Sequence, residues 1–200
     1  MNLDDYWVLF LVGTSVLALV VASPALSRLL VYPRTEYFSE MWLLGPDHRA
    51  EDYPFNVSRG QNYTVFLGVG DKLGYCAYYV VEVKFRNESM PAPSSFNRTS
   101  SSLSSLFNLT LVVADQTVWE EPLTFSFNYG LNESLLAVEF YSLTLNNVVL
   151  DLNGLSTGWN ATRSRFYGNL VFELWLHDSA SNLLVYHERY VDLKLNMTSH

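Results

Sequence analysis

The chain has 200 residues and a formal net charge of −8 at pH 7, with 16% charged and 49% hydrophobic residues. Its 12 Lys and Arg residues are scattered, which excludes a nucleic-acid partner, because phosphate binding needs clustered positive charge. One cysteine excludes an internal disulfide, and 13 Tyr with 12 Phe favour strands over helices.

The first predicted element is a transmembrane helix over residues 7–26. This segment, WVLFLVGTSVLALVVASPAL, carries no charge, and a helix of its length spans the roughly 30 Å hydrocarbon core of a bilayer. Asp4 and Asp5 precede it, where a cleavable secretory signal would carry basic residues. We therefore expect the helix to be retained. The sequence ASPALS also fits a cleavage site, which leaves a processed form open.

Two signals disagree about the orientation of this helix. Arg28 and Arg34 follow it, and the positive-inside rule would place the residues beyond them in the cytoplasm. Eight Asn-X-Ser/Thr sequons, all beyond the helix, indicate the opposite, because chance would give roughly 2 to 3. We therefore expect a single-pass protein of the cell membrane with its C-terminal domain extracellular. The predicted N-glycosylation sites are Asn56, Asn62, Asn87, Asn97, Asn108, Asn132, Asn160 and Asn196.

The stretch MWLLGPDHRAEDYPFNVSRGQNYT, residues 41–64, marks the change from the anchor to the outer domain. It contains three carboxylates, close to a histidine, whose oxygens could bind a hard cation, but their spacing does not match a calcium-binding loop. We expect a solvated turn here instead of a metal site. The four residues are Asp47, His48, Glu51 and Asp52.

Past residue 60 the apolar pattern has a period of two, which is typical of strands. Turn sequences such as GDKLG, NYGLN, LNGLSTG and HDSASN separate the alternating segments. Because two amphipathic sheets bury their apolar faces against each other, the pattern predicts an all-β, Ig-like antiparallel β-sandwich. The predicted strands cover residues 62–69, 78–85, 106–114, 123–130, 135–145, 169–178 and 189–197.

The pattern also predicts how the domain is divided. The anchor and its flanks occupy residues 1–34, and the extracellular β-sandwich occupies 35–200, with a possible inserted hairpin at 131–168. The Ser- and Pro-rich residues 90–105 predict a long exposed loop. Cys76, in GYCAYYVV, follows a strand-like alternation, and we expect a buried, unreactive thiol.

Few residues suggest chemistry. His177-Asp178 and His187-Glu188 would approach each other in a hairpin and would then suit zinc, although exposed strand residues are the simpler interpretation. The sequence holds no G-x-S-x-G, no phosphate-binding glycine loop and no Cys-x-x-Cys. We therefore expect no catalytic residue, no bound metal and no cofactor.

One stretch resembles a known family. Residues 37–83, which include YFSE, LLGP and AEDYP, are similar to the C-terminal extracytoplasmic domain of a mainly archaeal membrane-protein family, domain of unknown function 1616. Segments 112–127 and 170–195 resemble later parts of that domain. The family usually has several membrane helices and Asn-His-Glu where this chain has GDKLG, so no polar site carries over. The resemblance implies a β-sandwich outside an archaeal membrane and assigns no activity.

These observations predict a non-catalytic, membrane-anchored glycoprotein. We expect a structural or accessory subunit of an outer-face assembly or membrane complex, with membrane lipid and other surface proteins, or copies of itself, as partners. One alternative is an extracellular filament subunit assembled by β-strand addition. The other is a carbohydrate-binding ectodomain, in which exposed aromatic rings stack on sugars. Candidates for that role are Trp119, Trp159 and Trp175.

Overall fold

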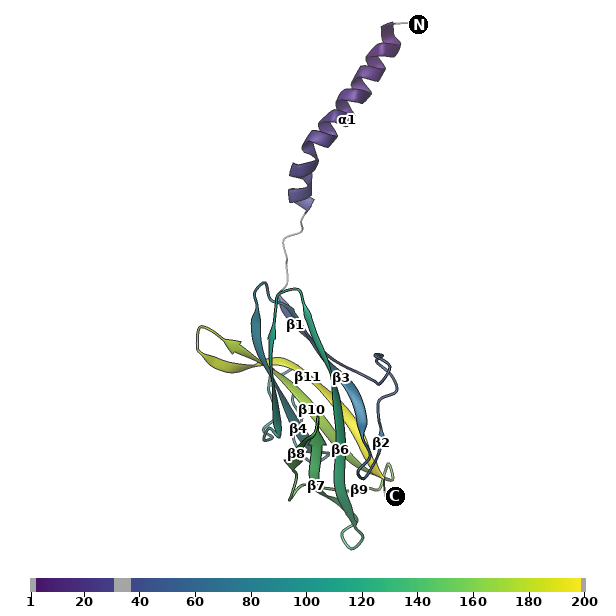
Figure 1. The fold of residues 1–200 in the computed structure, drawn as a ribbon, viewed down its shortest axis with the longest axis vertical. Helices are drawn as coiled ribbons and strands as arrows, with labels where there is room; N and C mark the ends of the chain where they lie inside the picture. Colours follow the sequence, from purple (N-terminus) through teal and green to yellow (C-terminus); the bar gives the residue numbers. More distant parts are fainter. Residues whose placement is uncertain (1–2, 31–36, 199–200) are drawn as a thin grey trace. The chain divides into compact units, whose positions relative to one another are not determined.

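The computed structural model describes residues 3–30 and 37–198. Its chain divides into two compact units, Met1–Tyr37 and Phe38–His200 (Figure 1). The first is helical and the second is built from strands. We describe each unit by itself.

The helical unit contains α1, which runs from Leu3 to Leu30. Its segment Tyr6–Pro24 has a mean hydropathy of 2.1 and is long and apolar enough to cross a membrane. The described side chains are apolar around the whole helix, as in a helix that is surrounded by lipid. The Thr14 hydroxyl donates to the Phe10 carbonyl at 2.9 Å, so this polar group is satisfied within the helix. The predicted apolar helix is confirmed.

The β unit consists of two layers that are joined into one curled sheet. The first layer has the order β1-β3-β6-β7, and both β8 and β9 pair with β7. These strands are β1 (Phe38–Leu44), β3 (Tyr63–Lys72), β6 (Val118–Asn132), β7 (Ala137–Leu145), β8 (Val148–Asp151) and β9 (Ser156–Asn160). The predicted all-β class is confirmed.

The second layer has the order β5-β4-β10-β11-β2. Its strands are β5 (Phe107–Val113), β4 (Ala77–Asn87), β10 (Arg165–Asp178), β11 (Leu183–Thr198) and β2 (Asn56–Ser58). Strand β9 also pairs with the start of β10, which connects the two layers. The stretch 131–168, where we expected an inserted hairpin, contributes β7, β8 and β9 to this arrangement.

The core lies between the layers and is filled by the inward half of each alternating strand. In β4 the side chains from Ala77 to Phe85 point inward at every second residue, and all of these are buried. Aromatic rings join the two layers, since the centroids of the Phe85 and Phe140 rings are 4.5 Å apart and Phe127 packs against both. The period-two pattern therefore encodes two apolar faces that bury each other.

Two local predictions are wrong. The sequence NYGLN, expected as a turn, lies inside β6. The register between β6 and β7 shifts there at a β-bulge between Asn128 and Tyr129. Cys76 is exposed, because β4 begins only at Ala77 and the thiol lies in the turn before it. The sandwich is also not wholly antiparallel, since β2 pairs with the end of β11 in parallel.

The two ends of the β unit differ in the loops they carry. The proximal end, as we call it, is where β1 begins and where tight turns lie at residues 73–76 and 114–117, and we include in it the β10–β11 hairpin, with its turn at 179–182, which projects sideways next to them (Figure 1). The distal end carries the turn between β6 and β7 and the starts of β3 and β10. The irregular segment 88–106 joins the distal end of β4 to β5.

Candidate functional site

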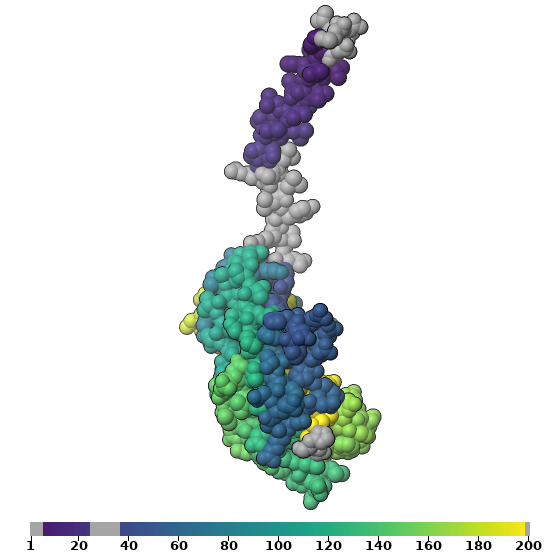
Figure 2. All heavy atoms as spheres, turned by 45° about the vertical axis from the view of Figure 1, so that its right-hand side comes forward, coloured from purple at the N-terminus to yellow at the C-terminus, as the bar shows by residue number. Residues whose placement is uncertain are grey.

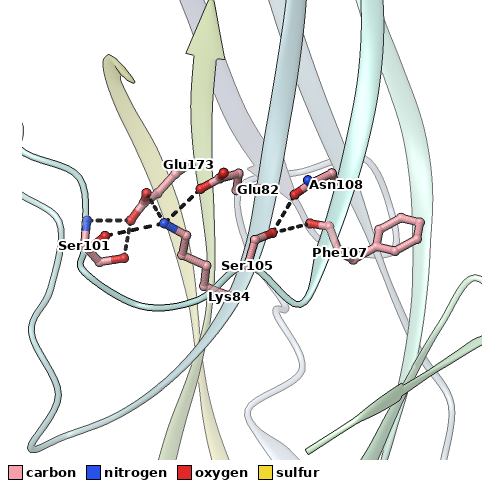
Figure 3. Close-up of polar contacts among 7 residues, drawn as sticks. All are labelled: Glu82, Lys84, Ser101, Ser105, Phe107, Asn108 and Glu173. Carbon is pink, nitrogen blue, oxygen red and sulfur yellow. Dashed lines mark hydrogen bonds and ion pairs between the residues drawn. The ribbon is translucent and has the colours of Figure 1, made fainter. Parts of the chain in front are cut away.

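Two buried charged side chains form a cluster on the outer face of the second layer (Figure 3). Lys84 of β4 points away from the core, because its neighbours Val83 and Phe85 occupy the inward positions. Glu173 of β10 lies on the same outer face. Lys84 and Glu173 are 2% and 0% exposed, although sequence alternation alone would leave both in solvent.

The charged atoms of Lys84 and Glu173 all have partners. The Lys84 Nζ lies 2.8 Å from Glu173 Oε2 and 2.9 Å from Glu82 Oε2. The Ser101 backbone N–H and hydroxyl both donate to Glu173 Oε1, at 2.9 and 2.5 Å. Ser101 belongs to the segment 88–106, so the cluster fixes this segment on the sheet (Figure 3). The sequence predicts residues 90–105 of this segment only as an exposed loop.

The electrostatics favour a structural role for the cluster. Burial lowers the pKa of Lys84, but the hydrogen bonds and charges of Glu173 and Glu82 outweigh that effect and the pKa is raised. The ammonium group therefore stays protonated and cannot serve as a nucleophile or a general base. It also lies 5.8 Å from the centre of the Trp175 ring, a cation–π contact.

A second polar cluster lies between the layers near the proximal end. The Ser39 Oγ of β1 is 2.5 Å from the Tyr79 hydroxyl and 2.9 Å from the His187 Nε2 of β11. Burial raises the pKa of Tyr79 to about 12. Burial, with the charge of Arg189 adding to it, lowers the pKa of His187, so this imidazole is neutral at pH 7.

The Ser39–His187 contact resembles a nucleophile and its base, but its setting differs. Ser39 is only 2% exposed, and its hydroxyl is shared with Tyr79, so it lies out of reach of a substrate. The buried Asp71 accepts a hydrogen bond from the Leu73 amide through one carboxylate oxygen, and its other carboxylate oxygen has no hydrogen-bond partner among the described residues. The two contacts of Ser39 join β1 of one layer to β4 and β11 of the other.

The residues considered for metal binding lie in separate surroundings. His177 contacts Asn182 at 3.2 Å, whereas His187 faces Ser39. His48 stacks on Phe66 with centroids 3.7 Å apart. Among the residues that the structure describes, no group of three or more His, Cys, Asp or Glu side chains is placed to hold a metal ion.

The sequon asparagines fall into two groups by the state of the side-chain nitrogen, to which a glycan is attached. In one group that nitrogen donates a hydrogen bond within the β unit. The pairs are Asn87 to the Ser156 carbonyl oxygen, Asn132 to Glu139 Oε1, Asn160 to Glu88 Oε2, and Asn196 to Asn56 Oδ1. In the other group the residue is exposed, and no hydrogen bond from this nitrogen is present within the described structure: Asn56, Asn62, Asn97 and Asn108.

The three tryptophans considered for sugar binding are not equivalent. Trp119 and Trp175 are half-buried. Trp159 is 43% exposed and packs edge-on against Phe166, with centroids 4.9 Å apart. The carbohydrate-binding alternative stays a prediction, with Trp159 as its most accessible ring.

A groove runs along one edge of β11. This strand pairs with β10 along its length, but β2 covers its other edge only at Asn196–Thr198. A cavity of about 650 Å³ lies beside the uncovered part and is lined by five consecutive residues, 190–194. Because successive strand residues face opposite sides, five in a row line a groove only along the strand edge. Leu43, Tyr53 and Phe55 form its apolar wall.

Comparisons with known proteins give a family and no activity. The model of the family described as domain of unknown function DUF1616 matches residues 33–141. No curated protein matches.

Solved structures resemble the chain only distantly. A β-glucosidase from Listeria innocua in complex with glucose is 8% identical over 84% of this chain, with a TM-score of 0.39. The chain spans only 17% of that enzyme's length. A chain of the human seminal-plasma complex between Zinc 2-glycoprotein and Prolactin inducible protein is 10% identical, with a TM-score of 0.38, over 84% of this chain and 100% of that one. Neither likeness bears on function.

Proposed function

We propose that the chain, which belongs to the DUF1616 family, is a non-catalytic cell-surface protein held in the membrane by α1. In this proposal the β unit lies outside the cell, carries N-linked glycans, and is a structural or accessory subunit of an outer-face assembly. The observation that carries the proposal is α1 itself. Its apolar segment Tyr6–Pro24 has a mean hydropathy of 2.1 and is long enough to cross the hydrocarbon core of a bilayer, where such a segment is stable.

The polar clusters support the non-catalytic part of the proposal. The buried charges of Lys84 and Glu173 are used to hold the segment 88–106, and Ser39 with His187 joins two layers. Groups that are paired and buried in this way are costly to separate and hold the elements that carry them together, whereas catalytic groups need access to a substrate. The sequons support the outward orientation, since four exposed asparagines have room for a glycan.

Labelling of intact cells tests the orientation. In the Cys76→Ser background, Leu135→Cys places a single thiol on an exposed residue of the distal end, and Asn2→Cys places one before α1. We expect a membrane-impermeant maleimide to label position 135 in intact cells and position 2 only after permeabilisation. The reverse pattern would overturn the proposal and restore the orientation favoured by Arg28 and Arg34.

The groove along β11 favours one second candidate, a filament subunit. An extended segment of another copy would pair with the uncovered edge of residues 190–194. This function requires release of α1 from lipid. Filaments sheared from cells, built from chains that lack residues 7–26, would favour it over the anchored subunit. Retention of the intact chain after alkaline carbonate washing of membranes would exclude it.

A further inference from the structure

The proximal end of the β unit exposes an unusual set of apolar side chains. Leu183 is 63% exposed, and its neighbours in the β10–β11 hairpin and in the turn before β4 are exposed too. The turns at this end are short, so these side chains have no long loop to cover them. The exposed residues are Tyr75, Tyr78, Val112, Val118, Leu183, Leu184 and Val185.

The sequons avoid this end. Seven of them lie at the distal end or in the segment 88–106, and the eighth, Asn108, lies near the start of β5, away from the proximal turn that follows this strand. Figure 2 shows one face of the β unit, on which its strands and loops form a continuous surface. Glycans are strongly hydrated and are excluded from a lipid surface, so their sites are expected to avoid a face that contacts lipid.

The distal end also exposes apolar side chains, but sequons lie beside them. Leu131 and Leu135 flank Asn132, and Trp159 precedes Asn160. A glycan at either asparagine would cover part of this surface. The proximal apolar residues have no sequon beside them, so a glycan would not shield them from water.

The short connection to α1 limits which surfaces the proximal end can contact. Residues 31–37, seven in all, separate the last residue of α1 from Phe38 of β1. An extended chain of this length reaches at most about 28 Å. With α1 in a bilayer, the proximal end is therefore tethered within reach of the lipid surface.

We propose that the proximal end binds the lipid surface of the same membrane, with the β10–β11 hairpin and the Tyr75–Tyr78 turn inserted at the boundary of headgroups and acyl chains. This inference rests on the proposed membrane location of α1. Tyrosine and aliphatic side chains suit that boundary. Of the nearby charges, Lys72 pairs with Glu40 at 2.7 Å, whereas Asp178 keeps its negative charge and accepts a hydrogen bond from Ser181 at 2.6 Å. In this proposal apolar burial drives the binding, and anionic lipid is not needed.

Cys76 provides a reporter for this contact. It is the only cysteine, it is exposed, and it lines a cavity of about 390 Å³ between the turn before β4 and the β10–β11 hairpin. We would label the full chain at Cys76 with a fluorophore in phosphatidylcholine nanodiscs that contain a nitroxide-labelled lipid. The matched control label is Leu135→Cys, and Val16→Cys reports α1, both in the Cys76→Ser background.

We expect quenching at Cys76 that is several-fold stronger than at position 135, with strong quenching at position 16. The triple variant Leu183→Ser, Leu184→Ser, Val185→Ser should reduce quenching at Cys76 several-fold, while the matched distal variant Leu131→Ser, Leu135→Ser, Leu136→Ser leaves it unchanged. Strong quenching at position 16 with equal, weak quenching at positions 76 and 135 would overturn this inference alone. No quenching at position 16 would overturn the anchor as well.

Discussion

The side-chain nitrogen of Asn196 donates a hydrogen bond of 2.8 Å to the Oδ1 of Asn56, so two predicted glycosylation sites are partners in the folded protein. Asn196 is 9% exposed, whereas Asn56 is exposed. The bond joins β2 to the end of β11, where these strands pair in parallel. A glycan would replace one of the two hydrogens on the Asn196 side-chain nitrogen, and a side chain that is only 9% exposed leaves little room for it beside this contact, whereas a glycan on Asn56 leaves its oxygen free to accept.

Glycan occupancy should therefore follow the state of the asparagine nitrogen. We expect high occupancy at Asn62, Asn97 and Asn108, which are exposed and have no hydrogen bond from this nitrogen in the described structure, and little at Asn196. Glycopeptide mass spectrometry of the full chain from native membranes measures each site. Full occupancy at Asn196 would show that glycans are attached before β11 pairs with β2.

Removal of the buried charge of Lys84 should destabilise the β unit strongly. Lys84→Met leaves the carboxylate of Glu173 without its partner, and we expect a loss of about 3–5 kcal/mol in the free energy of unfolding. The double variant Lys84→Met, Glu173→Gln should recover much of it, because the amide oxygen still accepts from Ser101. Denaturant unfolding in detergent measures both.

A matched ion pair at the surface serves as the control for Lys84. Arg49 lies 3.2 Å from Glu51, and both side chains are well exposed. Arg49→Met should change the unfolding free energy by about 0.5 kcal/mol or less. A similar loss for Lys84→Met and Arg49→Met would show that the buried cluster contributes no more than a surface pair.

The β unit should lose stability in alkali between pH 10 and pH 12. Burial raises the pKa of Tyr186 from its ordinary 10.0 to about 12, and it also raises the pKa of Tyr79 to about 12. The folded state holds these protons longer than the unfolded state, so their contribution is complete below pH 10 and is lost as the pH rises through the folded pKa. The raised pKa of Lys84 acts in the same direction above 10.5.

Tyr186→Phe isolates one part of this effect. The Tyr186 hydroxyl is buried without a hydrogen-bond partner in the described part of the chain, so its removal should leave stability at pH 7 unchanged or higher and flatten the alkaline loss. The unmodified chain is the reference for the pH profile. Thermal melts from pH 7 to 12 give the comparison, and an unchanged alkaline slope for Tyr186→Phe would contradict the assignment.

Gly68 should tolerate no side chain. It lies opposite Trp42 in the β1–β3 register, and a Cβ at this position would meet the Trp42 Cε2 at 2.1 Å. Trp42 is held by a hydrogen bond of 2.9 Å from its Nε1 to Glu120, so it cannot move freely. We expect Gly68→Ala to cost about 1–3 kcal/mol. A Cβ added at Gly158 would meet nothing within 4 Å, so Gly158→Ala should be close to neutral in the same unfolding assay.

Most strands could be predicted because their pattern is local. The alternation in residues 78–85 and 169–178 reports directly which side chains face the core, and these segments are β4 and β10. The helix over residues 7–26 was predicted for a similar reason, since length and apolar composition suffice. Cys76 was placed wrongly because alternation continued through a turn where the pairing had not yet begun.

Contacts between distant residues left no local signal. Lys84 and Glu173 are 89 positions apart, and only their adjacent strands reveal them as a pair. The same holds for Ser39 with His187 and for Asn56 with Asn196. A short strand such as β2, only 3 residues long, is too brief for periodicity to detect, so the parallel pairing was missed.

Membrane retention of α1 variants tests the central proposal most directly. Val16→Lys puts a charge in the middle of the apolar segment, at a cost of about 2.5–3.5 kcal/mol for insertion, whereas Leu135→Lys adds the same charge to the β unit. After alkaline carbonate washing of membranes, we expect the unmodified chain and Leu135→Lys in the pellet and Val16→Lys substantially in the supernatant. Release of all three chains into the supernatant would contradict anchoring by α1.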